Sequence, residues 1–120
     1  MPRANRNWTR EEHVLAFNLY CQIPFGQIDE GNPRVIELAQ LVGRTVGSAS
    51  KKLANFARLD PALQARGIRG LTHGAHGEED VWEELANDPE SLAFESERLR
   101  AQRLHRPLEE VAEIETRDLP

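Results

Sequence analysis

Residues 41–56 read LVGRTVGSASKKLANF and contain the expected end of one helix and the start of the next. Gly43 suits the left-handed conformation that commonly ends a helix, and Thr45 is a residue type that caps a helix N-terminus well. Beyond Thr45, apolar side chains recur at helical spacing: Val46, Ala49, Leu53 and Phe56. The stretch therefore predicts two helices joined by a tight turn, with one face of the second helix buried.

The opposite side of this second helix is expected to be polar and to face outward. Its residues are Ser48, Lys51, Lys52 and Asn55, with Arg44 in the turn and Arg58 one turn further on. A helix-turn-helix unit places its second helix in the major groove of DNA, where lysines neutralise phosphates and an asparagine can pair with an adenine edge. The same residue types are common on any solvated helix face, so the pattern is also typical of a plain structural bundle.

Two further helices are expected before this stretch. Residues 8–12 read WTREE and have the form of a capping box, which predicts a helix to about Gln22. Asn32 followed by Pro33 combines a capping residue with proline at the first helical position, and so begins a second helix that ends at Gly43. The front of the chain is therefore predicted to be a three-helix head.

The rest of the chain has a different character. Residues 66–77 read RGIRGLTHGAHG, and this glycine-rich composition predicts a loop. A short helix is expected from about Glu79 to Ala86, and a longer one from Pro89 to about Leu104. The predicted fold class is thus all-α, with a helix-turn-helix head, a Gly-rich loop and one or two C-terminal helices.

These expectations divide the chain into four parts. They are a three-helix DNA-binding head at 1–62, a Gly-rich loop at 63–78, an acidic helical appendage at 79–105 and a linker or tail at 106–120. Charge follows the same division: residues 1–70 carry ten Lys or Arg and six Asp or Glu, whereas residues 71–120 carry five and fourteen. The net charge of −5 therefore does not exclude a nucleic-acid partner for the front half. A basic arm before the first helix adds Arg3, Arg6 and Arg10 as candidate DNA contacts.

Other classes of function find less support in the sequence. The absence of a long apolar run or a signal peptide predicts a cytoplasmic protein with no membrane partner. Cys21 is the single cysteine, so a cysteine-based zinc site is not expected. His73 and His76 have a spacing that could begin a metal site, but a third and a fourth ligand are not apparent. We therefore expect no metal, no cofactor and no catalytic residue in this chain.

Four stretches carry a family resemblance: NWTREEHVLAFNLYCQIPFGQI, NPRVIELAQLVGRTVGSASKKLANFARLDPAL, GIRGL and VWEELANDPESLAFESERL. They resemble the N-terminal helical region of predicted HNH restriction endonucleases, and WTREE resembles the start of a Myb/SANT-type domain. The similarity covers about residues 7–104. It implies a DNA-recognition module, with recognition of modified DNA as one option. The positions that the resemblance implies as contacts are Arg44, Thr45, Ser48, Lys51, Lys52 and Asn55.

The chain departs from that family in one respect. It contains no HNH histidine–asparagine constellation and ends where the nuclease would begin, so the chain itself is not expected to cut DNA. The expected partners are double-stranded DNA and a nuclease domain in cis or in trans, which would hold any divalent metal. A homodimer is a further option. Two alternatives stay open: a protein-interaction or dimerisation module acting through the C-terminal helix, and a stand-alone helix-turn-helix transcriptional regulator.

Overall fold

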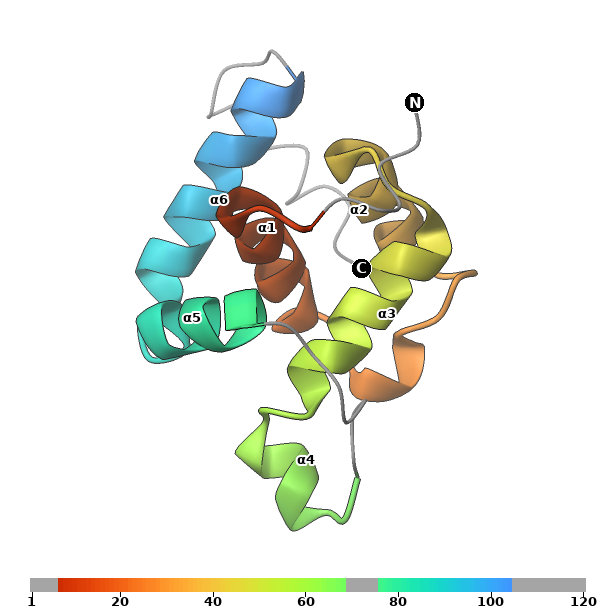
Figure 1. Ribbon diagram of the computed structural model, residues 1–120, viewed down its shortest axis with the longest axis vertical. Helices are drawn as coiled ribbons and strands as arrows, with labels where there is room; N and C mark the ends of the chain where they lie inside the picture. The colour runs from red at the N-terminus through yellow and green to blue at the C-terminus, as the bar shows by residue number, and fades with distance from the viewer. Residues whose placement is uncertain (1–6, 69–75, 105–120) are drawn as a thin grey trace.

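The computed structural model describes residues 7–68 and 76–104. Within these ranges all regular structure is helical, which confirms the all-α fold class. The elements are, in chain order, α1 (Arg10–Tyr20), the 3-10 turn η1 (Phe25–Gln27), α2 (Pro33–Val42), α3 (Val46–Ala57), α4 (Pro61–Ala65), α5 (His76–Leu85) and α6 (Pro89–Leu104) (Figure 1).

The expected helix starts are present with their capping bonds. At α1, the Thr9 hydroxyl accepts from the Glu12 N–H at 3.1 Å, and the Glu12 carboxylate accepts from the Thr9 N–H at 2.8 Å. At α2, the Asn32 side chain accepts from the Arg34 N–H at 2.8 Å. Each bond satisfies a backbone donor that would otherwise lack an intrahelical partner. The local sequence therefore determines where these helices begin.

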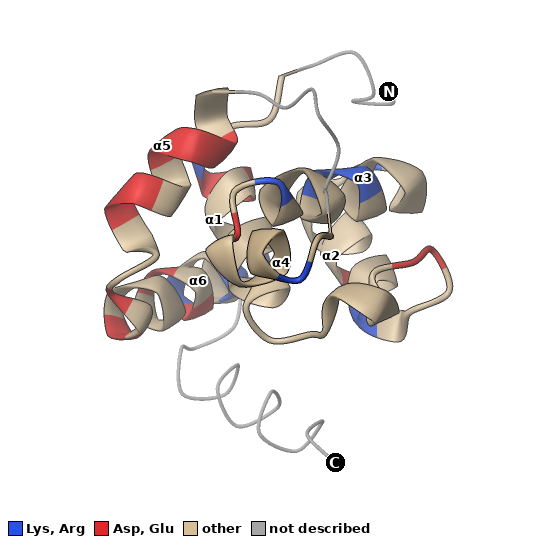
Figure 2. Cartoon of the chain, turned by 90° about the horizontal axis from the view of Figure 1, so that it is seen from below, with Lys and Arg blue, Asp and Glu red and all other residues tan. Residues whose placement is uncertain are grey.

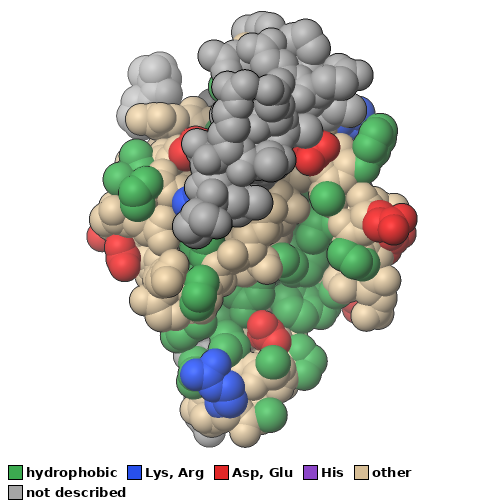
Figure 3. Space-filling view, turned by 180° about the vertical axis from the view of Figure 1, so that it is seen from behind, with side chains coloured by type: hydrophobic (Ala, Val, Ile, Leu, Met, Phe, Trp, Pro, Cys, Tyr) green, Lys and Arg blue, Asp and Glu red, His purple; other side chains and the backbone are tan. Residues whose placement is uncertain are grey.

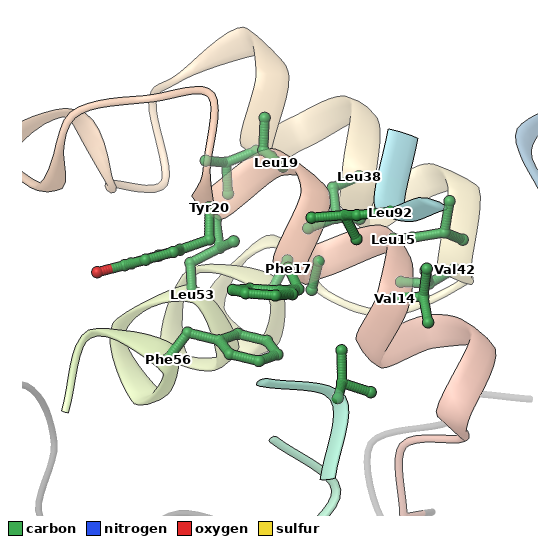
Figure 4. Packing of buried hydrophobic residues seen from close by; sticks show 14 of the residues in the cluster. Val14, Leu15, Phe17, Leu19, Tyr20, Leu38, Val42, Leu53, Phe56 and Leu92 are labelled. Atoms are coloured by element: carbon green, nitrogen blue, oxygen red, sulfur yellow. The ribbon is translucent and has the colours of Figure 1, made fainter. Parts of the chain in front are cut away.

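Helix α1 is the centre of the molecule. It packs against α2 and α3 on one side and against α5 and α6 on the other (Figure 1). Every residue from 12 to 20 is buried, so this helix is covered on all its faces. Figure 4 shows its aromatic side chains meeting those of α3: the rings of Phe17 and Phe56 stack with their centroids 5.1 Å apart.

The expected appendage shares this core with the head. Val81 and Leu85 of α5 and Leu92 and Leu99 of α6 are each at most 4% exposed and belong to the same hydrophobic cluster as the residues of α1. Trp82 lies against Phe17, with ring centroids 5.1 Å apart. The interpretation of 79–105 as an appendage to a self-contained head is therefore replaced by one core that all the long helices build.

Two element boundaries also differ from the expected ones. The short helix α4 lies across the expected boundary at residue 62, because Asp60 caps it and Pro61 occupies its first position. Helix α5 begins at His76, inside the segment that composition assigned to a loop. Of the expected glycine-rich loop, residues 69–75 lie outside the described residues, as do the last residue of the expected appendage, 105, and the linker or tail at 106–120.

Candidate nucleic-acid interface

The turn between α2 and α3 follows the sequence pattern closely. Gly43 adopts the left-handed conformation, with φ 70° and ψ 39°. The Arg44 N–H donates to the Ala39 carbonyl at 2.9 Å, and the Gly43 N–H donates to that of Gln40 at 3.3 Å. Thr45 then caps α3 by accepting a bond from the Ser48 N–H at 3.1 Å. The turn is therefore held by its own backbone and needs no partner to form.

One edge of α3 stays at the surface. Thr45 and Lys51 are exposed, and Ser48 between them is half-buried. Glycine at position 47 keeps the first turn of the helix narrow, and no acidic residue lies in that turn. We call Thr45, Ser48 and Lys51 the outer edge of α3. Of the predicted contacts in the turn and on α3, these three lie where a ligand could reach them.

Arg44 has a different position from the expected one. Its side chain is 1% exposed and forms an ion pair with Glu12, whose two carboxylate oxygens accept from the guanidinium at 3.1 and 3.0 Å. The Trp8 ring lies against the guanidinium at 4.7 Å. Burial alone would raise the pKa of Glu12, but hydrogen bonds from Arg44 and from the Thr9 backbone outweigh it and hold this pKa below its usual value. Arg44 therefore joins α1 to the start of α3 and does not face solvent.

Lys52, Asn55 and Arg58 form a cluster around one carboxylate of α5. The ammonium group of Lys52 lies 2.5 Å from Glu78, and Arg58 donates to the other Glu78 oxygen at 3.1 Å. The Asn55 amide lies 3.4 Å from Glu78, and Arg58 also reaches Glu79 at 3.3 Å. Glu78 is 0% exposed, Lys52 7% and Asn55 7%. Figure 2 shows the charges concerned, acidic along α5 and basic on α3.

The expectation that Lys52 and Asn55 face outward is therefore wrong. Lys52 lies one helical turn from both Ala49 and Phe56, at the border of the buried stripe of α3, and Asn55 lies one turn further along from Lys52, on the side that faces Glu78. The neighbouring α5 covers that border, which the periodicity of α3 alone could not reveal. A signal was present in the charges, because a basic front half and an acidic back half favour contact between the two.

The remaining arginines of the basic arm divide into two groups. Arg10 forms surface ion pairs with Glu84 of α5 and Glu95 of α6, at 2.5 Å each. Hydrogen bonds to Glu95 and then Glu84 raise the pKa of Arg10 above its usual value. Arg3 and Arg6 lie outside the described residues. Asn7, where the description begins, accepts a bond from Arg44 through its carbonyl at 3.1 Å, so the chain enters the fold beside the start of α3.

His13 is a site residue that the sequence did not single out. It is 2% exposed, and its Nδ1 lies 2.9 Å from the Thr9 carbonyl, while its Nε2 has no hydrogen-bond partner among the described residues. A Cβ on Gly77 would lie 2.4 Å from the ring, so only glycine fits there. Burial, and then the charge of Lys52, lower the pKa of His13. The His13 ring of α1 therefore packs closely against Gly77 at the start of α5 and resists protonation more than a free imidazole does.

The rear face carries an apolar hollow next to α4, where hydrophobic side chains gather in Figure 3. Its lining includes Phe25, Leu63 and Trp82, and the Tyr20 hydroxyl donates to Asp60 at 2.7 Å beside it. Burial and the bond to Asp60 raise the pKa of Tyr20 well above its usual value, so the phenol stays protonated. The polar groups of this hollow are therefore engaged within the fold.

Metal ligation finds no site in the described part of the chain. No group of three or more His, Cys, Asp or Glu side chains in residues 7–68 and 76–104 is arranged to hold an ion. His76 is exposed, with its ring 3.3 Å from Glu79, and His73 lies outside the described residues. Among the helices of these ranges, none is long and apolar enough to span a bilayer.

Comparison with known proteins gives no relative for this chain: no protein-family model matches it, and neither does any curated protein or solved structure. Its function is therefore inferred from the arrangement of its own residues.

Proposed function

We propose that this chain is a DNA-binding, target-recognition module of a restriction-type HNH endonuclease, with cleavage supplied by a nuclease domain in cis or in trans. The observation that carries the proposal is the placement of the outer edge of α3. Thr45, Ser48 and Lys51 lie on one exposed edge, and Asn7 is held beside the start of the same helix by Arg44. Arg3 and Arg6 precede Asn7 in the sequence, and Asn7 itself lies beside the start of α3.

The chemistry of this edge suits a phosphate backbone. The first turn of α3 contributes N–H groups, the positive end of the helix dipole and no acidic side chain. Lys51, in the second turn, adds an exposed cation. One neighbour opposes an anion: the Glu30 carboxylate would lie 3.2 Å from a Cβ placed on Gly47. We therefore expect binding through the helix start and Lys51, with Glu30 weakening it.

The buried pairs have a positioning role in this proposal. Arg44 with Glu12 ties α3 to α1, and Lys52 with Glu78 ties it to α5. Such contacts fix the angle at which the outer edge is presented, and a recognition surface works best on a rigid support. Lys52 and Asn55 then act on DNA binding through the orientation of α3 and do not touch the nucleic acid.

The test is a titration of labelled duplex DNA, read by fluorescence anisotropy at several salt concentrations. Lys51→Gln should weaken binding to every duplex and reduce the slope of log affinity against log salt by about 0.9, because one phosphate contact is lost. Glu30→Gln should strengthen binding. Arg66→Gln removes an exposed cation on another part of the surface and serves as the matched control.

Two results would reject the proposal: no duplex binding at low salt, or equal affinities for Lys51→Gln and the parent chain. The same titration over matched unmodified and modified duplexes tests the option of modified-DNA recognition. A preference would appear as a difference in affinity at one fixed salt concentration, and equal affinities would remove that option while leaving DNA binding intact.

A further inference from the structure

Helix α6 has two opposite faces: within the described residues one packs on the core, and the other carries Phe94, with Glu95 at its edge paired to Arg10 of α1. Leu92, Ser96 and Leu99 are at most 4% exposed and face the core. Phe94 lies two positions from both Leu92 and Ser96, which corresponds to about 200° around a helix. It therefore points away from the core. Two large hydrophobic residues are exposed in the described ranges, and Phe94 is the more exposed of them, at 59%.

The surface around Phe94 is hollowed and charged in an ordered way. A shallow hollow is lined by Glu90, Ser91, Phe94, Glu95 and Arg98. These residues form a stripe along one side of α6, because Glu90, Phe94 and Arg98 are each about one helical turn apart and Ser91 and Glu95 lie beside them. Glu90 lies four residues before Phe94 and Arg98 lies four residues after it. An acid and a base are thus placed symmetrically on either side of one exposed aromatic ring.

We propose that two copies of this chain pair through this face of α6, antiparallel, with the two Phe94 rings in contact at the two-fold axis. In that arrangement Glu90 of each copy faces Arg98 of the other, so both charge contacts are attractive. A parallel pairing in register would instead place Glu90 against Glu90 and Arg98 against Arg98. The order acid, aromatic ring, base is complementary to itself when it is reversed. It therefore favours a second copy of this chain as the partner, and the antiparallel orientation of the two helices.

The small size of this surface limits the affinity of the dimer. Helix α6 has 16 residues, which corresponds to a length of about 24 Å. A single helix face of that length buries less area than a standard stable interface. We therefore expect a reversible dimer, with a dissociation constant in the micromolar range or weaker. The inference stands on α6 alone and does not require the outer edge of α3 to bind DNA.

The first measurement is sedimentation velocity of the whole chain from about 5 to about 500 µM, a range that brackets weak association. The sedimentation coefficient should rise with concentration, and Phe94→Ser should weaken the dimer about tenfold or more. Leu104→Ser, which changes the other exposed large hydrophobic residue, should leave association unchanged. A chain that stays monomeric throughout, or equal loss in both variants, would overturn the proposal.

The second measurement uses charge exchange. Glu90→Arg alone and Arg98→Glu alone each place like charges opposite one another twice, so each variant should self-associate more weakly than the parent chain. An equimolar mixture of the two variants should form heterodimers, and the double variant should recover self-association. Circular dichroism checks that helix content is unchanged, which is expected because both side chains are exposed. If mixing restores nothing, the antiparallel pairing is wrong.

Discussion

Two groups of ion pairs are built from similar residue types, but one group is buried and the other is exposed. The Glu78 carboxylate is 0% exposed and accepts hydrogen bonds from Lys52, Asn55 and Arg58. These interactions replace the water that the carboxylate loses when it is buried. At the surface, Arg10 bridges Glu84 and Glu95 with its side chain 46% exposed. The comparison teaches that a lysine or arginine on a helix does not by itself indicate a ligand-binding face, because a later segment of the same chain can satisfy it.

The largest effect should come from removing the buried carboxylate. Glu78→Ala leaves the buried Lys52 ammonium and Asn55 amide without the carboxylate that they contact, and breaking a buried pair in this way costs about 3–5 kcal/mol. The measurement is urea unfolding at pH 7. Glu79→Ala, which removes the half-exposed partner of Arg58, should cost less than about 1 kcal/mol. Similar losses for the two variants would remove the distinction between buried and exposed pairs.

A second test addresses the packing of the start of α5 against His13 of α1. Gly77→Ala adds a methyl group where the His13 ring already lies at 2.4 Å, and overpacking of this kind costs about 1–3 kcal/mol. The cost should fall when His13 is first replaced by alanine, because the ring that clashes is then absent. Thermal unfolding of the two single variants and the double variant gives this coupling. Additive effects would mean that the ring and the glycine do not oppose each other.

The sequence predicted the parts of this structure that depend on neighbouring residues. The capping box at Thr9, the Asn32-Pro33 start and the left-handed Gly43 are each determined within a few residues, and each was predicted from them. Glu78 instead fell within the predicted Gly-rich loop at 63–78, and nothing in its own segment reveals the three donors that approach it from α3 and the end of that helix. Prediction therefore failed where the environment of a side chain comes from a distant part of the chain.

The candidate site follows the same rule. Lys51 is exposed as expected, because it lies on the side of α3 opposite its apolar stripe, and Thr45 is exposed at the N-cap before the first turn of the helix. Lys52 lies at the margin of that stripe and Asn55 lies one turn along from Lys52, and the packing of α5 over both places them in the interior; Arg44, in the turn before α3, is buried against Glu12 of α1. The periodicity of apolar residues along a helix identifies the centre of its buried face reliably, but the borders of that face depend on which other elements pack beside it.

A smaller effect than those of Glu78 and Gly77 is expected from pH. Burial lowers the folded-state pKa of His13 below its usual value of 6.5, so the unfolded chain binds the proton more readily. Stability should therefore be constant above that pH and should decrease as pH falls below it towards the folded-state pKa. Below about 4.5, loss of the Glu12 charge beside Arg44 adds a second decrease. Unfolding free energies at pH 7.5 and 5.5 test the first step, and the difference should shrink in His13→Gln.

The smallest effect should come from the surface pairs. Arg10→Gln removes contacts at 2.5 Å to both Glu84 and Glu95, yet exposed pairs contribute only about 0–1 kcal/mol because water and salt screen them. We expect a loss within that range at low salt, and a smaller one at about 1 M salt, where the screening length is short. Urea unfolding at both salt concentrations measures the two values. A loss as large as that of Glu78→Ala would mean that Arg10 fastens α5 and α6 to α1, and that exposure is a poor guide to the importance of an ion pair in this fold.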